Sequence, residues 1–294
     1  MPSDPRRPQP ITRGYLAMID RLYWRLRPSA MPYFRLLDRI HQHLVPRTYL
    51  EIGVSTGGSL TLALPGTLNV GIDPEPRVAL PVDPGSQIFV EESDAFFTRH
   101  ELREVLGGRP LDLAFIDGMH HFEFALRDFM NIERRSAPET TVLIHDCYPL
   151  DEASAGRDRC PGKWSGDVWR LIVCLKEQRP DLSISVVDVG PTGLGIITGL
   201  DPASRVLHDE YDELVARYLE LPYRHLTEGD KASILNRVPN DWAVVERLLP
   251  PVPFRPDHLA PLVTRRAVRA GWPASRRMLH RQVERLRHRV PAGG

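Results

Sequence analysis

Short apolar runs recur through the first two thirds of the 294-residue chain, and polar stretches with helical spacing separate most of them. Runs of about five residues rich in valine, isoleucine and leucine are typical of strands buried in a parallel sheet. The predicted strands are 49–54, 68–72, 87–91, 111–116 and 141–145. Between the last two, the stretch from His121 to Pro138 has the spacing of a helix that ends at its proline. This pattern predicts an α/β fold whose sheet is covered by helices on both faces.

The pattern changes after Cys147. A polar loop over 150–163 leads to another helical stretch, and two more apolar runs follow at 183–189 and 194–198. Only the turn Gly-Pro-Thr-Gly separates these runs, and strands joined by so short a turn pair as an antiparallel hairpin. We therefore expect a seven-stranded, mostly parallel sheet that closes with this hairpin.

Amphipathic segments flank the predicted sheet on both sides. We predict an N-terminal tail and helical cap over 1–46, a central domain over 47–200, and a C-terminal helical extension over 201–294. The expected helices of these flanks are 11–27, 31–44, 203–219, 241–248, 259–270 and 273–289. The last is strongly basic, which suits an anionic membrane surface, nucleic acid, or docking onto the more acidic remainder of the chain.

Charge and cysteine content exclude some classes of protein. Lysine plus arginine equals aspartate plus glutamate, 38 of each, so no global field points to nucleic acid. The three cysteines form no CxxC pair, which fits a reducing cytoplasm. The N-terminus has no apolar signal-peptide region, and no apolar run approaches the roughly 18 residues of a membrane span. We expect a cytoplasmic protein with no transmembrane segment.

Small residues follow the first predicted strand, in the sequence YLEIGVSTGGSL. Glycines there allow a sharp turn and let the backbone approach a ligand at the carboxyl edge of the sheet. The second strand ends at Asp73, about 20 residues after the loop, where a carboxylate can accept both hydroxyls of a ribose. A plain strand-to-helix turn is the alternative interpretation of the glycines.

Aspartate and histidine follow the fourth and fifth strands. Asp117 and His120 come after the fourth, and His145 and Asp146 end the fifth. Two carboxylates on neighbouring strand ends make an oxygen site that suits Mg²⁺. A divalent cation lowers the pKa of a bound hydroxyl, and an imidazole can take up its proton. The pattern predicts one site at which a hydroxyl oxygen becomes a nucleophile.

The glycine loop, the acid in Gly-Ile-Asp-Pro and the closing hairpin together resemble the class I S-adenosylmethionine-dependent methyltransferases over about 49–198. The spacing GxxxGG, with an acid inside the strand, differs from the GxGxxG of a dinucleotide site. The resemblance makes 47–200 an S-adenosylmethionine-binding domain. It implies that the methionine part is held by Glu51, Gly53, Ser55 and Gly57 and the ribose by Asp73. Asp94 would lie near the adenine, and the backbone of Ser93 or Ala95 is the alternative contact.

The motifs FIDGMHHFE and LIHDCYP resemble one branch of that class, with IDGxH after strand four and HD after strand five. Relatives in this branch include metal-dependent O-methyltransferases of sugars and natural products. The resemblance implies that Asp117 and Asp146 bind Mg²⁺ or another divalent cation and that His120 is the general base. Metal-dependent relatives often have a second acid where this chain has His145. That residue could bind a softer cation such as Zn²⁺ or Mn²⁺, or act as a base without metal.

Other polar residues near these motifs have ordinary alternative roles. We expect His121 to start the helix, and Glu123 and Asp128 to lie on its solvated or loop-facing side. Trp164 and Asp167 could contact a sugar acceptor, or Asp167 could face a helix N-terminus.

We therefore predict an S-adenosylmethionine-dependent O-methyltransferase of secondary metabolism that acts on a hydroxyl of a small molecule or sugar. Three alternatives stay open: a protein that keeps the fold without transferring methyl groups, a nucleic-acid methyltransferase that uses the basic tail, and a hydroxylase that shares IDGxH. The chain lacks the Asn/Asp-Pro-Pro-Tyr type of loop, so we expect no nucleic-acid partner. The helical extensions are candidates for contacts in a homo-oligomer.

Overall fold

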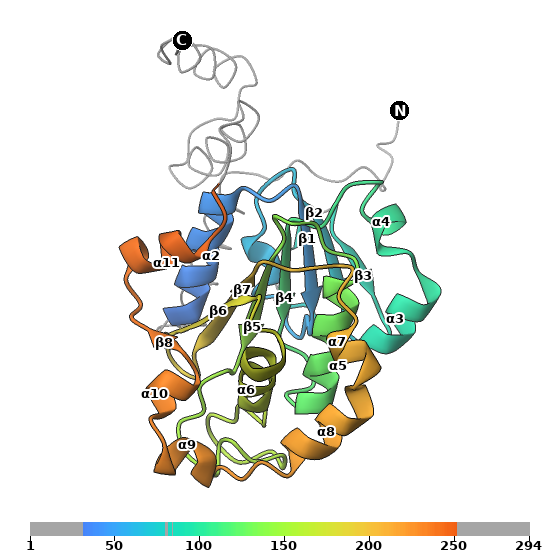
Figure 1. Ribbon diagram of the computed structural model, residues 1–294. Coiled ribbons are helices and arrows are strands. Elements are labelled where there is room, and N and C mark those ends of the chain that lie inside the picture. The colour runs from blue at the N-terminus through green and yellow to red at the C-terminus, as the bar shows by residue number, and fades with distance from the viewer. Residues whose placement is uncertain (1–31, 80–81, 84, 252–294) are drawn as a thin grey trace, which may run out of the picture. The chain divides into compact units, whose positions relative to one another are not determined.

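A mixed sheet of eight strands organises the part of the chain that the computed structural model describes, residues 32–79, 82–83 and 85–251 (Figure 1). The strands are β1 Thr48–Ile52, β2 Leu68–Ile72, β3 Gln87–Phe89, β4 Leu113–Ile116, β5 Thr141–His145, β6 Ser183–Val187, β7 Leu194–Thr198 and β8 Arg237–Val238. Their order across the sheet is β3-β2-β1-β4-β5-β7-β6-β8. The first five pair in parallel, whereas β7 is antiparallel to both β5 and β6.

The predicted parallel sheet and closing hairpin are confirmed, but the sheet has eight strands and not seven. The additional strand, β8, comes from the C-terminal part of the chain and pairs in parallel with β6. It is only two residues long, Arg237 and Val238, and so short a segment leaves no apolar alternation in the sequence. Its pairing depends on the neighbouring strand.

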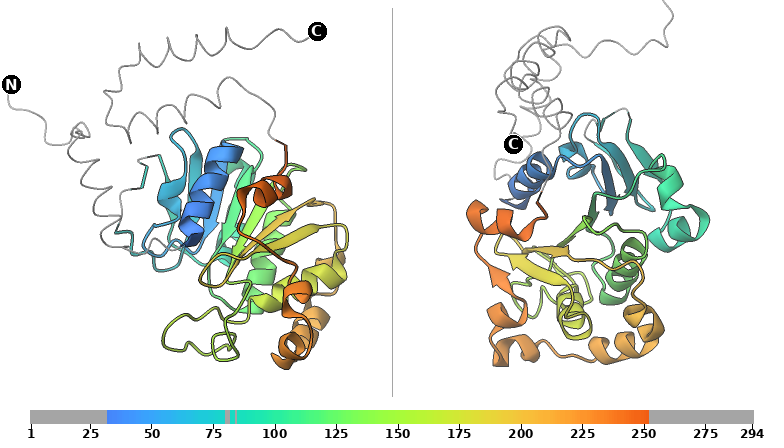
Figure 2. Two further views of the ribbon diagram at one scale, coloured as in Figure 1. Left: turned by 90° about the vertical axis from the view of Figure 1, so that its left-hand side faces the viewer. Right: turned by 45° about the horizontal axis from the view of Figure 1, so that its top comes forward.

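Helices cover both faces of the sheet. They are α2 Pro32–Leu44, the 3₁₀ turn η1 Leu60–Leu62, α3 Ser93–Arg99, α4 Leu102–Val105, α5 Phe122–Glu133, α6 Trp169–Gln178, α7 Val206–Asp209, α8 Tyr211–Leu219, α9 Arg224–Glu228, α10 Lys231–Ile234 and α11 Trp242–Leu248. α2 and α11 lie on one side of the sheet (Figure 2). The opposite core contains side chains of α3, α5, α6 and α8.

Alternation along the central strand divides its side chains between the two cores. Leu50 and Ile52 of β1 belong to the α5 side, whereas Tyr49 points to the α2 side. Glu51 follows Tyr49 in that alternation and is fully buried. One buried carboxyl group is therefore built into the middle of an apolar strand, directly below the glycine loop.

The connections that follow β1 and β2 differ from the expected helices. The predicted helix after the glycine loop is a single 3₁₀ turn, η1, followed by Pro65. Between β2 and β3 the described residues contain no helix, and Pro74 and Pro76 begin that connection. Proline removes a backbone donor and clashes with the preceding helical turn, so a helix cannot continue there.

Three of the helices predicted in the N- and C-terminal flanks, 31–44, 203–219 and 241–248, fall mostly or wholly on described residues. The helix predicted at 31–44 corresponds to α2 and the one at 241–248 to α11, whereas the segment 203–219 divides into α7 and α8. The predicted helices 11–27, 259–270 and 273–289, and with them the basic tail, lie outside the described residues.

Residues 201–251 pack on the same cores as the central sheet. Leu207, Leu214 and Tyr218 join the α5 side, and Val245 and Leu249 join the α2 side. The domain boundary at residue 200 stays a prediction. Among the described helices, none is long and apolar enough to cross a membrane.

Candidate functional site

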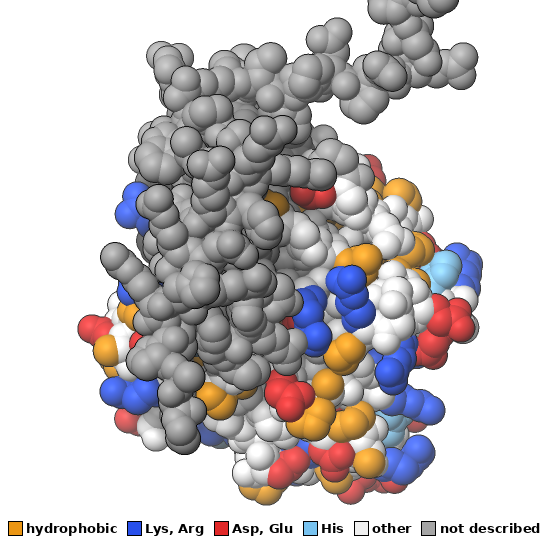
Figure 3. Space-filling view, turned by 90° about the horizontal axis from the view of Figure 1, so that it is seen from above, with side chains coloured by type: hydrophobic (Ala, Val, Ile, Leu, Met, Phe, Trp, Pro, Cys, Tyr) orange, Lys and Arg blue, Asp and Glu red, His pale blue; other side chains and the backbone are white. Residues whose placement is uncertain are grey.

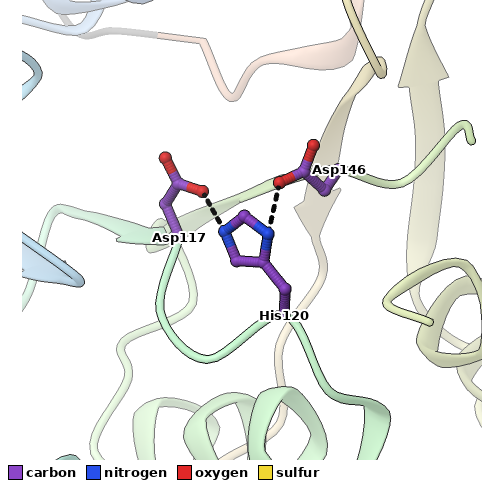
Figure 4. A group of neighbouring side chains, drawn as sticks. All are labelled: Asp117, His120 and Asp146. Carbon is purple, nitrogen blue, oxygen red and sulfur yellow. Dashed lines mark ion pairs between the residues drawn. The ribbon is translucent and has the colours of Figure 1, made fainter. Parts of the chain in front are cut away.

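The ends of β4 and β5 bring four polar side chains together. Ile116 pairs with Ile144 in the sheet register, which places Asp117 beside His145. His120 bridges the two carboxylates: its Nε2 is 3.2 Å from Asp117 Oδ1, and its Nδ1 is 3.1 Å from Asp146 Oδ2 (Figure 4). His145 Nδ1 lies 3.2 Å from each of the same two oxygens. The four residues that the sequence singled out thus form one cluster.

The backbone holds two members of this cluster in an uncommon conformation. His120 has a φ of 59° and Asp146 a φ of 62°, in the left-handed region. Such residues cost about 1–3 kcal/mol each and persist only where surrounding contacts hold them. The carbonyl of His120 accepts a hydrogen bond from Asp167 N at 3.1 Å, and the hydroxyl of Thr192 donates to Asp146 Oδ1. These contacts fix the direction of both side chains.

Mutual charge stabilises the ionised forms of this cluster. Burial by itself would raise the pKa of Asp117, but the charge of His145 and hydrogen bonds from both imidazoles lower it well below its usual range. Burial would lower the pKa of His145, yet the charges of Asp117 and Asp146 raise it to about 10. The pKa of His120 is raised against the same burial effect, mainly by its hydrogen bond to Asp117. Asp117 and His145 are therefore favoured in their charged forms, and the carboxylates beside His120 favour its protonated form.

The cluster also fits a divalent cation. Asp117, His120 and Asp146 each offer one ligand atom, and these atoms lie within 4.8 Å of one another. Asp146 Oδ2 and His120 Nδ1 are buried and have no well-directed hydrogen bond, although they are 3.1 Å apart. Two carboxylate oxygens and an imidazole nitrogen are ligands for Mg²⁺, Mn²⁺ or Zn²⁺. These three residues could therefore hold a divalent cation.

The glycine loop lies directly against this cluster. Gly53 has a φ of 90°, and a Cβ atom there would lie 2.1 Å from the carbonyl oxygen of Asp117. Only glycine fits that position, because the loop and the end of β4 share this space. Asp73 Oδ2 accepts a hydrogen bond from Ser55 N at 2.7 Å, and its Oδ1 accepts one from Glu75 N at 2.7 Å. The predicted cofactor residues at the ends of β1 and β2 therefore lie side by side; Gly57, with a φ of 81°, belongs to the same loop.

Glu51 lies below the loop. The hydroxyl of Tyr49 donates to its Oε2 at 2.7 Å, and the hydroxyl of Ser59 donates to its Oε1 at 2.6 Å. Burial is the main cause that raises the pKa of Glu51 to about 8. Its carboxyl group supports the loop from beneath, and a direct contact with a methionine ammonium group stays a prediction.

Asp94 lies in the first turn of α3, immediately after the β3 edge of the sheet. Its Oδ2 accepts a hydrogen bond from Arg127 Nε at 2.7 Å, and Arg127 also donates to the hydroxyl of Tyr211 at 2.6 Å. The side chain of Asp94 is 42% exposed, so it stays accessible beside that ion pair. Contact with adenine stays a prediction.

Asp128 contradicts the expectation of a solvated helix face, because its side chain is only 3% exposed. It lines a small pocket together with Gly118, Met119 and Ala125. Among the described residues its Oδ1 has no hydrogen-bond partner, and burial raises its pKa to about 7. Its position three residues after the buried Ala125, on the same helix face, was the sequence signal that could have indicated burial.

Replacing Asp128 with asparagine is expected to stabilise the protein at pH 8 but not at pH 4. The folded-state pKa is raised from 3.8 to about 7, so the folded protein binds more protons and loses stability as pH rises through that window. A neutral amide removes this loss. We expect the variant to melt about 2–6 °C above the wild type at pH 8. Thermal melts at both pH values, with the exposed Asp209→Asn as control, check this, and an equal difference at both would contradict it.

The loop after β5 contacts the candidate base. The indole ring of Trp164 stacks on His120 with ring centroids 5.1 Å apart and planes inclined by 19°. Trp164 Nε1 donates to the carbonyl of Gly156 at 2.7 Å, which fixes the ring. The sequence allowed a sugar as the partner of Trp164, whereas in the structure the imidazole of His120 occupies one face of the indole.

Asp167 serves a helix terminus. It is fully buried, and its Oδ1 accepts a hydrogen bond from Phe122 N at 2.7 Å, at the start of α5. Its Oδ2 accepts from Arg157 at 2.8 Å and from Arg170 at 2.5 Å. With both oxygens engaged, Asp167 serves the N-terminus of α5 and not that of α6, the helix that follows it and that the sequence alternative concerned; His121 is the N-cap residue of α5 as expected.

Comparison with known proteins gives one match in sequence. Residues 50–147 match the family model described as a methyltransferase domain. No curated protein matches the sequence.

Solved structures with a similar fold include O-methyltransferases. One is the O-methyltransferase from Bacillus cereus in complex with SAH, at 16% identity and a TM-score of 0.45, covering 66% of this chain and 93% of that chain. Another is TomG from Streptomyces achromogenes, an O-methyltransferase of tomaymycin synthesis in complex with SAM, at 18% identity and a TM-score of 0.44, covering 63% and 89%. A third is the SAH-bound Podospora anserina methyltransferase PaMTH1, at 15% identity and a TM-score of 0.46, covering 63% and 88%.

Proposed function

We propose that this chain, whose residues 50–147 match the model of a methyltransferase domain, transfers the methyl group of S-adenosylmethionine to a hydroxyl oxygen of a small molecule or sugar. A divalent cation between Asp117 and Asp146 would assist this reaction. The observation that carries the proposal is the carboxylate pair bridged by His120, which lies against the glycine loop at one edge of the sheet. The residues that would activate the acceptor therefore lie next to those that would bind the cofactor.

The loop after β1 and the acid after β2 suit the cofactor. Gly53 and Gly57 have positive φ and no side chain, so the backbone can approach a ligand closely. Each oxygen of Asp73 accepts one backbone hydrogen bond and can accept another from a ribose hydroxyl. S-adenosylmethionine, when bound there, supplies an electrophilic methyl group.

The two histidines would have different roles. His120 is 22% exposed at the cluster, whereas His145 is 7% exposed and packs against the ring of Tyr33, with centroids 4.2 Å apart. His120 is therefore the better placed to take a proton from an acceptor hydroxyl, and His145 would mainly hold the charges of the two carboxylates. His120 can act as a base only after it loses its own proton. A cation on Asp117 and Asp146 would favour that loss, because it takes up the charge that raises the imidazole pKa.

The alternative functions receive less support. A protein that only binds the cofactor has no use for two imidazoles held between two carboxylates. A nucleic-acid methyltransferase would need a basic surface, whereas the face in Figure 3 has acidic and basic side chains interspersed among the described residues.

A reducing cytoplasm is proposed from the three free cysteines Cys147, Cys160 and Cys174, and secondary metabolism from the IDGxH and HD motifs.

Calorimetric titration with S-adenosylmethionine tests the proposal first. We expect saturable binding to the wild type, and binding at least about 10-fold weaker in Asp73→Ala, because a charged acceptor for the ribose is lost. Asp83→Ala is the matched control, since Asp83 also accepts a backbone hydrogen bond in the β2–β3 connection. Titrations with and without Mg²⁺ separate the two sites. Failure of the folded wild type to bind in either buffer would count against a methyltransferase.

A further inference from the structure

Two cations lie near the same aromatic ring, close to the candidate site. The Lys231 ammonium lies 4.3 Å from the centre of the Tyr148 ring, and the Arg237 guanidinium carbon lies 5.2 Å from it. Tyr223 provides a second ring, 5.9 Å from Lys231. Both cations come from residues after 200, at α10 and β8, whereas Tyr148 follows β5.

This group lies beside the catalytic edge of the sheet. Tyr148 comes two residues after Asp146, so their Cα atoms are at most about 8 Å apart. Thr192 connects them, because its carbonyl accepts Tyr148 N at 2.6 Å and its hydroxyl donates to Asp146. A molecule with one oxygen at Asp146 can therefore place another group beside Tyr148.

The ammonium group of Lys231 makes fewer hydrogen bonds within the described residues than it can donate. Among the described residues, its ammonium group makes one hydrogen bond, to the carbonyl of Pro149, and two donors remain. Burial and then the charge of Arg237 lower its pKa. Two acids lie close to these cations: Asp188 pairs with Arg237, and the exposed Asp151, whose charge acts on Lys231, accepts a hydrogen bond from Ser154 N at 2.8 Å.

We propose that Tyr148, Lys231 and Arg237 form a subsite that binds an anionic group, carboxylate or phosphate, of the hydroxyl acceptor. The subsite rests on the proposed function and specifies its substrate class. An anion bound between the two cations relieves their repulsion. It also accepts hydrogen bonds from the two remaining N–H groups of the Lys231 ammonium. The rings of Tyr148 and Tyr223, with the 54%-exposed Leu150, contact the apolar part of the same molecule. The acceptor is then an amphipathic acid whose hydroxyl reaches Asp146.

Binding of simple anions tests the subsite without methyl transfer. The probes are benzoate and phenyl phosphate, with uncharged benzyl alcohol as the matched neutral compound, titrated into the full chain by NMR at constant ionic strength. We expect at least one anion to bind with a Kd of about 1 mM or tighter, and at least about 10-fold tighter than benzyl alcohol. The stronger of the two anions distinguishes a carboxylate acceptor from a phosphate acceptor.

Substitutions assign this binding to the subsite. Lys231→Met and Arg237→Gln are each expected to weaken anion binding at least about 10-fold. Arg217→Gln, which removes an exposed arginine paired with Glu177 on α6, is the matched control and should bind as the wild type does. Unchanged melting temperatures show that each variant is folded. If Lys231→Met does not fold, Arg237→Gln alone still decides the test.

Three outcomes overturn the subsite: neither anion binds saturably, benzyl alcohol binds as well as the anions, or the control variant loses as much affinity as the other two. Titration of the same proteins with S-adenosylmethionine keeps the two proposals separate. Anion binding without cofactor binding would leave the subsite in place and contradict the methyltransferase function. Cofactor binding without anion preference would do the reverse.

Discussion

Asp146→Asn is expected to lower turnover by about 100- to 1000-fold while S-adenosylmethionine binds nearly as tightly as to the wild type. Asparagine keeps the size of the side chain and can still accept the hydrogen bond from Thr192. It removes the negative charge that lies 3.1 Å from His120 and 3.2 Å from His145. Without that charge the cluster would hold the proposed cation poorly, and the acceptor hydroxyl would stay protonated. The proposed cofactor residues at the ends of β1 and β2 are not changed.

Initial rates with an acceptor found by screening, beside calorimetric titration of the cofactor, check this expectation. Asp117→Asn should behave similarly, since Asp117 is the second carboxylate that His120 contacts. Asp209→Asn is the matched control, an exposed aspartate on α7 that pairs with Arg205. If either cluster variant weakened cofactor binding as much as Asp73→Ala does, the division into two sites would be wrong.

Gly53→Ala is expected to disrupt both sites at once. A Cβ atom at Gly53 would lie 2.1 Å from the carbonyl oxygen of Asp117 and 2.8 Å from Gly118 Cα. These neighbours are backbone atoms, so the loop and the end of β4 must separate. The positive φ adds strain of about 1–2 kcal/mol for any L-residue. We expect a loss of unfolding free energy of at least about 3 kcal/mol and loss of both cofactor binding and turnover.

Gly66→Ala separates the two causes. Gly66 has the same φ of 90°, but nothing lies within 4 Å of a Cβ atom placed there. This variant should show the backbone strain alone, a loss of about 1–2 kcal/mol, with cofactor binding intact. Denaturant unfolding of both variants measures the difference. Equal destabilisation would mean that contact with Asp117 is not what requires glycine at position 53.

The sequence by itself determined the strands and the placement of the chemistry. β2, β5 and β7 begin and end at the predicted residues 68–72, 141–145 and 194–198, because a run of buried β-branched side chains between turn residues is a local signal. The aspartates and histidines of the cluster follow the ends of β4 and β5, and parallel pairing of those strands is enough to bring them to one edge. The loop glycines and Asp73 could be placed at the same edge for the same reason, because they follow β1 and β2.

Only the tertiary structure decided which partners these polar side chains have and which of them are buried. Asp167 caps α5 from 45 residues away, Trp164 stacks on His120, and the buried carboxyl group of Asp128 lines a small pocket with Gly118 and Met119. β8 exists because β6 offers it a partner. Each of these features depends on contacts between segments far apart in the chain. Local propensity and periodicity report which residues lie on one strand or helix, whereas the partner of a polar side chain is set by packing.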